Sequence, residues 1–150
     1  MKVIIDTNIL VNVLLSPNKE SASFKVLELC LMRKIFPQVG HALFCEYEDV
    51  FSRVELRIQT RYTDSEIEGI LDGFLNVCKW SKVHYLWRPN LKDEGDNHLI
   101  DLAVASGAEW IVTQNVRDLN SGDLRFGFKA ITALKFLEVY LDGDNNLPDN

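Results

Sequence analysis

The chain opens with the stretch Val3-Ile4-Ile5-Asp6-Thr7-Asn8, in which three β-branched residues lead directly to a carboxylate. Such a short apolar run predicts a buried parallel strand. A charge at the end of a buried strand needs a partner. Asp6 is therefore either a member of a polar site or the N-cap of a helix predicted over residues 9–15. Asn8, two residues further on, is placed to hold the Asp6 carboxylate.

The rest of the chain alternates between strand-like and helix-like segments. Further strands are predicted over residues 36–39, 82–86, 110–113 and 128–131. Helices are predicted over residues 20–35, 42–53, 63–78, 96–106 and 132–141. This alternation indicates βαβ units and a parallel sheet. Ligands of such sheets gather beyond the carboxyl ends of the strands, and Asp6 and Asn115 both follow predicted strands.

Helix ends and the C-terminal composition define the expected domain. Thr63 and Glu66 form a T-x-x-E capping box, and Gly107 is placed to end the helix that begins at Asp96. Residues 142–150 are acidic and rich in turn-forming residues, which indicates a frayed tail. We therefore predict a single domain over residues 1–141, followed by a flexible acidic tail over 142–150.

The composition of the 150-residue chain is that of an ordinary globular domain, with 47% hydrophobic and 25% charged residues. The net charge is −6 and the isoelectric point about 5.0. These values argue against a generic basic nucleic-acid coat, because non-specific phosphate binding is largely electrostatic. They do not exclude a nuclease, since bound metal ions can locally reverse the field of an acidic cleft.

The cysteines and the N-terminus bear on the expected location. Cys30, Cys45 and Cys78 lie in mainly apolar stretches without a C-x-x-C spacing, which predicts buried free thiols in a reducing cytoplasm. The first residues reach Asp6 too soon for a signal peptide. No run of about 18 apolar residues predicts a transmembrane helix. We expect a cytoplasmic protein with no membrane segment.

Four short acidic clusters are the candidates for a functional site. They are Asp6-Thr7-Asn8, Glu46-Tyr47-Glu48, Asp93-Glu94-Gly95-Asp96 and Asn115-Val116-Arg117-Asp118. Carboxylates that converge in space repel one another unless a cation lies among them, and hard divalent ions on oxygen ligands usually serve phosphate chemistry. The clusters therefore predict a Mg²⁺ or Mn²⁺ site. Taken singly, each cluster is also explained as a helix N-cap, a solvated helix face or a polar turn.

Helical geometry narrows these candidates only in part. Glu46 and Glu48 are two positions apart and do not share a helix face, so at most one points into the site. The pattern leaves the choice open, and a solvated position for either is the favoured interpretation. Asp96 lies at a helix N-terminus, where the helix dipole keeps a carboxylate ionised. Asp101 lies about 140° around that helix and is predicted to be solvated.

The clusters lie in a particular order within the longer stretches 3–11, 46–53, 93–103 and 110–119. In this order they resemble the PIN-domain family of metal-dependent ribonucleases. With the segment from Ile131 to Leu137, the resemblance spans nearly the whole chain. It is closest to the toxins of bacterial or archaeal toxin–antitoxin pairs. It implies a three-layer α/β/α sandwich with a central, mostly parallel sheet of four to five strands, a small antitoxin partner and a homodimer.

The resemblance also implies a role for each cluster. Many members carry Asp at the position of Asn115, whereas others show T-x-N-x-x-D, in which Asp118 supplies the charge. The implied catalytic and metal-binding residues are Asp6, Glu46, Asp96 and Asp118, which would hold one or two Mg²⁺ or Mn²⁺ ions. The implied supporting residues are Asn8, Asp93, Thr113 and Asn115.

RNA must still approach an acidic protein. Four basic residues near the clusters are candidates for phosphate contacts or, alternatively, part of a solvated basic face: Arg53, Arg57, Lys92 and Arg117. Trp80, Tyr85 and Trp87 are predicted to pack in the core or at an oligomer interface, with base stacking as the alternative. A structural or surface role is predicted for His98.

The main prediction is a metal-dependent endoribonuclease that hydrolyses RNA phosphodiester bonds as the toxin of a toxin–antitoxin pair. One alternative is a PIN-like module that binds RNA or protein without cleavage, because Asn115 stands where many members have an acid. Another is a phosphohydrolase, in which an Asp after the first strand is a nucleophile. That class has a second Asp two residues later, where this chain has Asn8.

Overall fold

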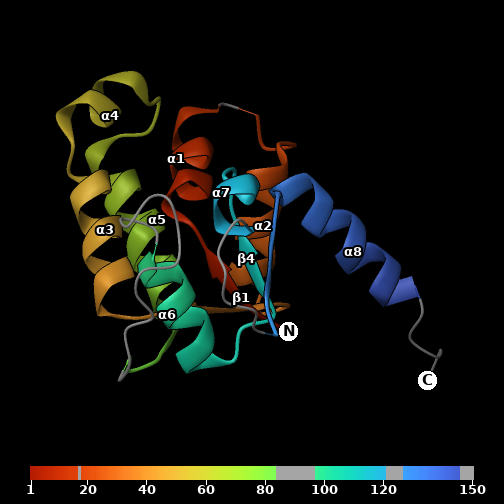
Figure 1. Cartoon of the computed structure of the whole chain (residues 1–150). Coiled ribbons are helices and arrows are strands. Elements are labelled where there is room, and N and C mark those ends of the chain that lie inside the picture. Colours follow the sequence, from red (N-terminus) through yellow and green to blue (C-terminus); the bar gives the residue numbers. More distant parts are fainter. Residues whose placement is uncertain (17, 84–96, 121–126, 146–150) are drawn as a thin grey trace.

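The computed structural model describes residues 1–16, 18–83, 97–120 and 127–145. Five parallel strands form one sheet (Figure 1): β1 (Lys2–Ile5), β2 (Phe36–Val39), β3 (Lys79–Trp80), β4 (Trp110–Val112) and β5 (Lys129–Ile131). The helices are α1 (Thr7–Leu15), α2 (Ala22–Leu31), α3 (His41–Phe51), α4 (Val54–Gln59), α5 (Asp64–Val77), α6 (Asn97–Ser106), α7 (Val116–Asn120) and α8 (Ala133–Asn145). The predicted α/β sandwich with a parallel sheet is confirmed.

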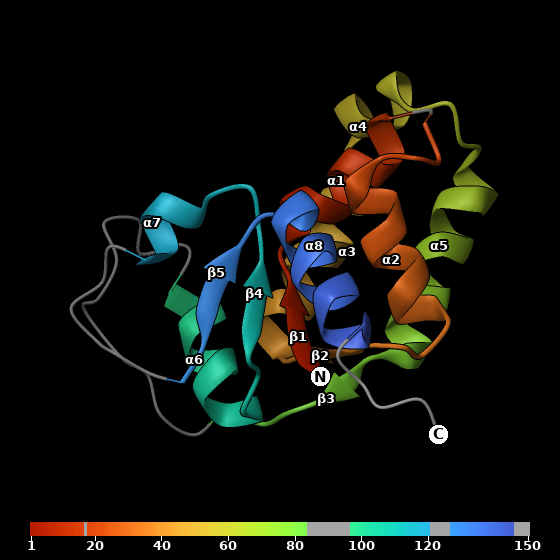
Figure 2. The same ribbon diagram turned by 90° about the vertical axis from the view of Figure 1, so that its right-hand side faces the viewer.

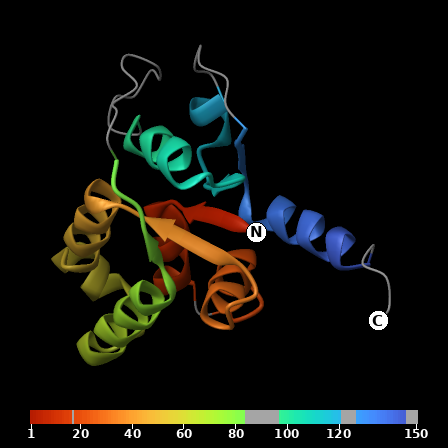
Figure 3. The same ribbon diagram turned by 90° about the horizontal axis from the view of Figure 1, so that it is seen from below.

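The strand order β3-β2-β1-β4-β5 has a switch point between β1 and β4. The chain builds outward from β1 to β3 on one side, then crosses to β4 and β5 on the other. In Figure 3, α1 and α2 lie on one side of the sheet and α6 on the other. A crevice forms at the carboxyl ends of the strands beside such a switch. Asp6 and Thr113 follow β1 and β4 directly, and Ile5 pairs with Val112, so both residues lie at the carboxyl ends of the two strands that flank the switch point.

The core lies between the sheet and the helices on its two sides, and Figure 2 shows α5 farther from the strands than α2, which it contacts. Val3, Ile4 and Ile5 are at most 1% exposed, as expected for a central parallel strand. The predicted capping box of α5 is confirmed, because Thr63 and Glu66 exchange side chain–backbone hydrogen bonds of 3.1 and 3.2 Å. None of the described helices has the length and apolar character needed to cross a membrane.

The end of α6 also agrees with the prediction. Gly107 has a φ of +71°, a left-handed conformation that glycine adopts without strain. Its N–H donates to the Ala103 carbonyl at 3.0 Å and so closes the last turn of the helix.

Several predicted boundaries were wrong. The strand that follows α5 is Lys79–Trp80. Residues 82–83, at the start of the strand predicted over 82–86, are not in a strand, and residues 84–86 lie outside the described residues. The helix predicted over residues 42–53 ends at Phe51, where the Ser52 hydroxyl donates to the Asp49 carbonyl at 2.8 Å. A second helix, α4, then begins. The final helix continues past residue 141 to Asn145.

Two side chains also differ from their predicted exposure. Asp101 was predicted to be solvated but is 3% exposed. The middle of α6 is enclosed on most sides, because Ile100, Leu102 and Ala103 are buried as well. Among the free cysteines, Cys30 is buried as predicted and Cys78 is half-buried, but Cys45 is exposed.

Candidate functional site

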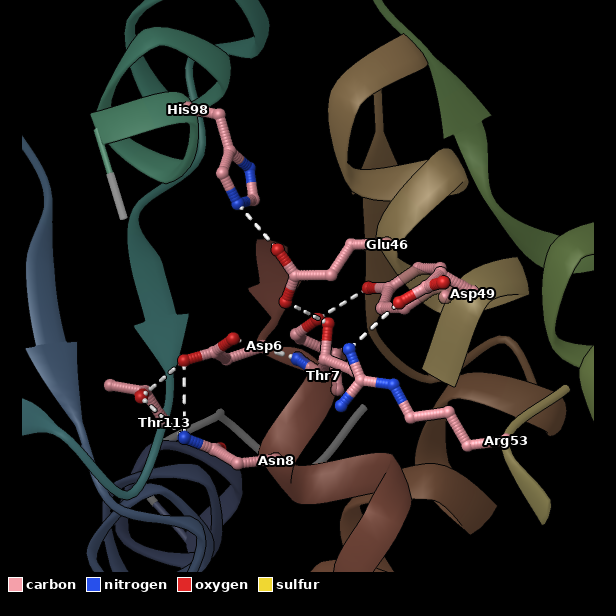
Figure 4. A network of polar contacts seen from close by, with 10 residues as sticks. Asp6, Thr7, Asn8, Glu46, Asp49, Arg53, His98 and Thr113 are labelled. Atoms are coloured by element: carbon pink, nitrogen blue, oxygen red, sulfur yellow. Dashed lines mark hydrogen bonds and ion pairs between the residues drawn. The ribbon is translucent and has the colours of Figure 1, made fainter. Parts of the chain in front are cut away.

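Asp6 lies where β1 ends and α1 begins (Figure 4). Its backbone N–H donates to the Val112 carbonyl at 2.9 Å, which ties it to β4. Its Oδ1 accepts the Thr7 N–H at 2.7 Å, so Asp6 caps α1. Its Oδ2 accepts the Thr113 hydroxyl at 2.7 Å and the Asn8 side-chain amide at 3.2 Å. The N-cap interpretation of Asp6 is therefore confirmed, and the same carboxylate belongs to a polar cluster, whereas its role in a functional site stays a prediction.

The electrostatic environment of Asp6 opposes its ionisation. The residue is 5% exposed, and this burial raises the pKa of its carboxyl above the usual value. The hydrogen bonds from Thr113 and Thr7 act in the opposite direction, while the negative charge of Glu46 raises the pKa further. A cation beside Asp6 would relieve both the burial of its charge and the repulsion by Glu46.

Glu46 reaches the same edge of the sheet from α3. The neighbouring Tyr47 is fully buried, and its hydroxyl donates to the Ile5 carbonyl, which holds α3 against β1. Glu46 Oε1 accepts the Thr7 hydroxyl at 2.5 Å, and Oε2 lies 2.8 Å from His98 Nε2 on α6. The hydrogen bond with His98 is the main reason that the pKa of Glu46 lies below its usual value. Glu46 is thus kept ionised at the site.

Thr7 joins the two carboxylates, because its N–H donates to Asp6 and its hydroxyl to Glu46. A carboxylate has about four lone-pair positions for acceptor contacts. Within the described structure, Asp6 accepts from Thr7, Asn8 and Thr113, and Glu46 from Thr7 and His98. Each keeps capacity for a cation, and oxygen ligands of this kind are those that Mg²⁺ and Mn²⁺ prefer. The two carboxylates therefore fit such an ion as part of its ligand set.

The other predicted ligands are not placed by the described structure. Asp96, and with it Asp93 and Lys92, lies outside the described residues. Asp118 lies on α7, and its side chain is likewise outside the described part of the chain. Among the described residues, no group of three or more His, Cys, Asp or Glu side chains could hold a metal ion. The structure thus brings together two of the four predicted ligands, and the other two stay predictions.

The supporting residues form a hydrogen-bonded chain from β4 to Asp6. Thr113 is fully buried, and its hydroxyl also accepts the Asn115 N–H at 3.0 Å. Asn8 Oδ1 accepts the Gln114 N–H at 3.2 Å. The side chain of Asn115 is exposed, and its carbonyl accepts the Leu119 N–H at 3.3 Å at the start of α7. Asn8 and Thr113 therefore orient Asp6 directly, whereas Asn115 acts on it through Thr113.

Two of the arginines predicted to contact RNA are paired with carboxylates. Arg53 Nη2 lies 2.7 Å from Asp49 Oδ2, and both side chains are exposed. Arg57 Nη1 lies 2.8 Å from Asp64 Oδ1, and its Nε donates to the Phe51 carbonyl at 3.1 Å. These pairings weaken the positive potential that both arginines present to an approaching phosphate. Arg117 is exposed on α7.

Sequence reasoning missed the roles of Thr7 and His98. Thr7 stands between Asp6 and Asn8 in the opening motif, but its bond to Glu46 depends on how α3 packs against β1. His98 lies 52 positions from Glu46 and contacts it only because α3 and α6 meet beside the sheet. The one sequence signal for His98 was its position two residues after Asp96.

Comparisons with known proteins agree with this fold. The family model for the PIN domain matches residues 2–117, which is more than half of the chain. A chain in the crystal structure of VapBC2 from Rickettsia felis, bound to a DNA fragment from its promoter, is similar with a TM-score of 0.57. It shares 16% sequence identity over 88% of this chain and 98% of that chain, which supports the fold alone. No curated protein matches the sequence. The chain belongs to the PIN-domain family.

Proposed function

We propose that this protein is a divalent-metal-dependent endoribonuclease and the toxin of a toxin–antitoxin pair. The observation that carries the proposal is the pair formed by Asp6 and Glu46, joined through Thr7 at the switch point of the sheet. PIN domains are in general nucleases that depend on divalent metal ions. A pair of close carboxylates, one buried and one kept ionised, is the arrangement that such an ion would stabilise.

The site residues have two proposed roles, as metal ligands and as groups that orient those ligands. Asp6 and Glu46 would hold Mg²⁺ or Mn²⁺, with Asp96 and Asp118 proposed to complete the ligand set. Such an ion lowers the pKa of a bound water and stabilises the leaving oxygen of a phosphodiester. Thr7, Asn8 and Thr113 fix the rotamer of Asp6, and His98 fixes that of Glu46, so that both carboxylates are held in position before the metal binds.

The toxin role rests on family and fold. The similar structure named above is a VapBC2 assembly from Rickettsia felis bound to promoter DNA. We propose by analogy that this chain pairs with a small antitoxin protein, forms a homodimer and acts on RNA in the cytoplasm. The free cysteines agree with a reducing compartment.

A PIN-like module that binds RNA or protein without cleavage is the second candidate. It is favoured by Asn115, whose side chain is exposed at a position where the family resemblance suggests an acid. The two candidate functions differ in one respect: a binding module would bind metal or RNA but would not cleave the RNA.

Cleavage of single-stranded RNA tests the proposal. The wild-type protein is assayed with Mn²⁺ and with EDTA, beside the Asp6→Asn variant with Mn²⁺. We expect RNA cleavage only in the sample that contains the wild-type protein and Mn²⁺ without EDTA. Cleavage that persists in EDTA and in the variant would exclude the metal-nuclease function. Binding of Mn²⁺ without cleavage of any RNA tested would favour the binding module.

A further inference from the structure

We propose that a cavity beside Glu46 binds one nucleobase of the RNA, with Trp80 as the stacking surface and Lys82 as the contact to a neighbouring phosphate. This inference rests on the proposed nuclease function and adds a substrate-binding subsite to it. It assigns base recognition to the end of β3, and not to Arg57 of α4 or Arg53, which precedes that helix.

The cavity has a volume of about 650 Å³ and lies among β3, the start of α3 and α6. Sites for small organic ligands have volumes in this range. Its walls are largely apolar and include Leu43, Val83 and Leu102 together with Trp80. Apolar and aromatic surfaces are what proteins use to receive an unstacked base of single-stranded RNA.

The cavity adjoins the carboxylate pair. His98 lines the cavity and also lies 2.8 Å from Glu46 Oε2. Ala42 lines it from α3, and Glu46 follows four residues later on the same face of that helix, about 6 Å along its axis. A phosphodiester bound at Asp6 and Glu46 would therefore have the base of an adjacent nucleotide within reach of the cavity.

Trp80 is held in place yet accessible. Its ring packs against Phe44 with centroids 5.2 Å apart and planes inclined by 56°. The residue is nevertheless 52% exposed, so it does not pack in the core, and the other predicted location, an oligomer interface, stays a prediction. An indole that is already fixed loses little conformational entropy when a base stacks on it.

Lys82 supplies a cation at the same cavity. It is exposed and has no hydrogen bond or ion pair with any other residue in the described ranges. Arg53 and Arg57, in contrast, are both committed to carboxylates. In a protein of net charge −6, the Lys82 ammonium would supply a positive charge for an RNA phosphate at the cavity that His98 also lines.

Binding of fluorescein-labelled single-stranded RNA to the Asp6→Asn protein tests the subsite without requiring cleavage. Trp80→Ala and Lys82→Ala are added to that background. The matched controls are Phe36→Ala, another half-exposed aromatic residue at the opposite end of the strands, and Lys79→Ala, which lines a different cavity.

We expect Trp80→Ala to weaken RNA binding roughly tenfold, the loss that removal of one base–aromatic stack produces. Lys82→Ala should weaken binding and lower its salt dependence by about one ion. The two control variants should bind as the Asp6→Asn protein does. In a series of RNAs that each lack one base at a different position, one RNA should bind the Trp80→Ala variant and its parent protein with the same affinity.

The inference is overturned if folded Trp80→Ala protein binds RNA as Phe36→Ala protein does. If Trp80→Ala fails to fold, the RNA affinity of Lys82→Ala tests the inference instead, because the exposed Lys82 side chain makes no contact within the described residues on which folding could depend. The same two substitutions are also made in the wild-type protein, where RNA cleavage that is unaffected by either one would exclude the subsite and leave the nuclease function in place. RNA binding that depends on Trp80 without any cleavage would keep the subsite and exclude the nuclease. Absence of RNA binding altogether would exclude both.

Discussion

Thr113 donates its hydroxyl hydrogen to Asp6 Oδ2 over 2.7 Å, although the two residues are 107 positions apart. The bond connects the residues that follow β1 and β4, the strands on either side of the switch point. Thr113 is fully buried, so no water can replace its hydroxyl without rearrangement of the site. The orientation of the buried carboxylate therefore depends on a residue that itself carries no charge.

Replacement of Thr113 by valine should weaken metal binding and RNA cleavage together, by about 10- to 100-fold, the usual effect of losing a partner that orients a metal ligand. The side chains have nearly the same shape, so the change removes the hydroxyl and little else. Mn²⁺ titration calorimetry gives the affinity. Thr60→Val is the matched control. The Thr60 hydroxyl donates to the Leu14 carbonyl over 2.6 Å, and this hydrogen bond is not part of the site. Equal effects of the two substitutions on Mn²⁺ affinity would count against the orienting role.

Replacement of Asp6 by asparagine should stabilise the metal-free protein near neutral pH. Burial raises the pKa of Asp6 in the folded state, so the contribution of Asp6 to stability is most favourable below the ordinary aspartate pKa and is lost as pH rises through the raised value. The variant has no such loss. Thermal unfolding in EDTA across the acidic to neutral range measures the difference.

Added Mn²⁺ should reverse this order, because an ion that binds only the folded state raises the unfolding temperature of the wild type and not of Asp6→Asn. Asp72→Asn, an exposed carboxylate on α5, serves as the control and should follow the wild type throughout. An Asp6→Asn protein that is less stable than the wild type in EDTA would show that the Asp6 charge is not unfavourable in the metal-free fold.

Substitution by glutamine should reduce RNA cleavage at Glu46 but leave it unchanged at Glu48. Glu46 contacts Thr7 and His98 at the site, whereas Glu48 is exposed and lines a separate cavity between α3 and α5. We expect Glu46→Gln to reduce cleavage by at least about 100-fold, as a lost metal ligand should. Glu48→Gln, two positions away on the same helix, should cleave as the wild type does. Comparable activities of the two variants would remove Glu46 from the metal ligands.

Replacement of His98 by alanine should shift the acidic limb of the pH–cleavage profile to higher pH. His98 is the main cause of the lowered pKa of Glu46, and Glu46 must be ionised to bind metal. Without His98 that pKa rises, so activity is lost at a higher pH than in the wild type. His98→Gln keeps a side-chain donor and should shift the profile less. Identical profiles for all three proteins would mean that His98 does not tune Glu46.

The sheet and the position of Asp6 were predictable because they depend on local patterns. Val3, Ile4 and Ile5 form a short β-branched run that is typical of a buried strand, and the Thr63–Glu66 capping box depends on residues one helical turn apart. The third strand was placed three residues too late. Lys79–Trp80 is exposed and too short to have an apolar pattern, and it is defined by its pairing with Gln38 and Val39.

The site was predictable only where a motif marks it. Helix geometry could not choose between Glu46 and Glu48, because the choice depends on Tyr47 holding α3 against β1. The prediction for Asp101 failed because helical periodicity describes one exposed face, whereas α6 is enclosed on several. The contacts of Thr7 and His98 with Glu46 join segments 39 and 52 positions apart, and no local pattern contains them.

The central claim is that Asp6 and Glu46 share one divalent cation. Anomalous diffraction from crystals soaked in Mn²⁺ tests it most directly. We predict a peak bound by a carboxylate oxygen of Asp6 and one of Glu46, at about 2 Å from each, the usual distance for Mg²⁺-like ions. The same soak of Asp6→Asn crystals should lack the peak. A wild-type structure in which Mn²⁺ binds elsewhere, with Asp6 and Glu46 still bonded only to their protein partners, would contradict the account.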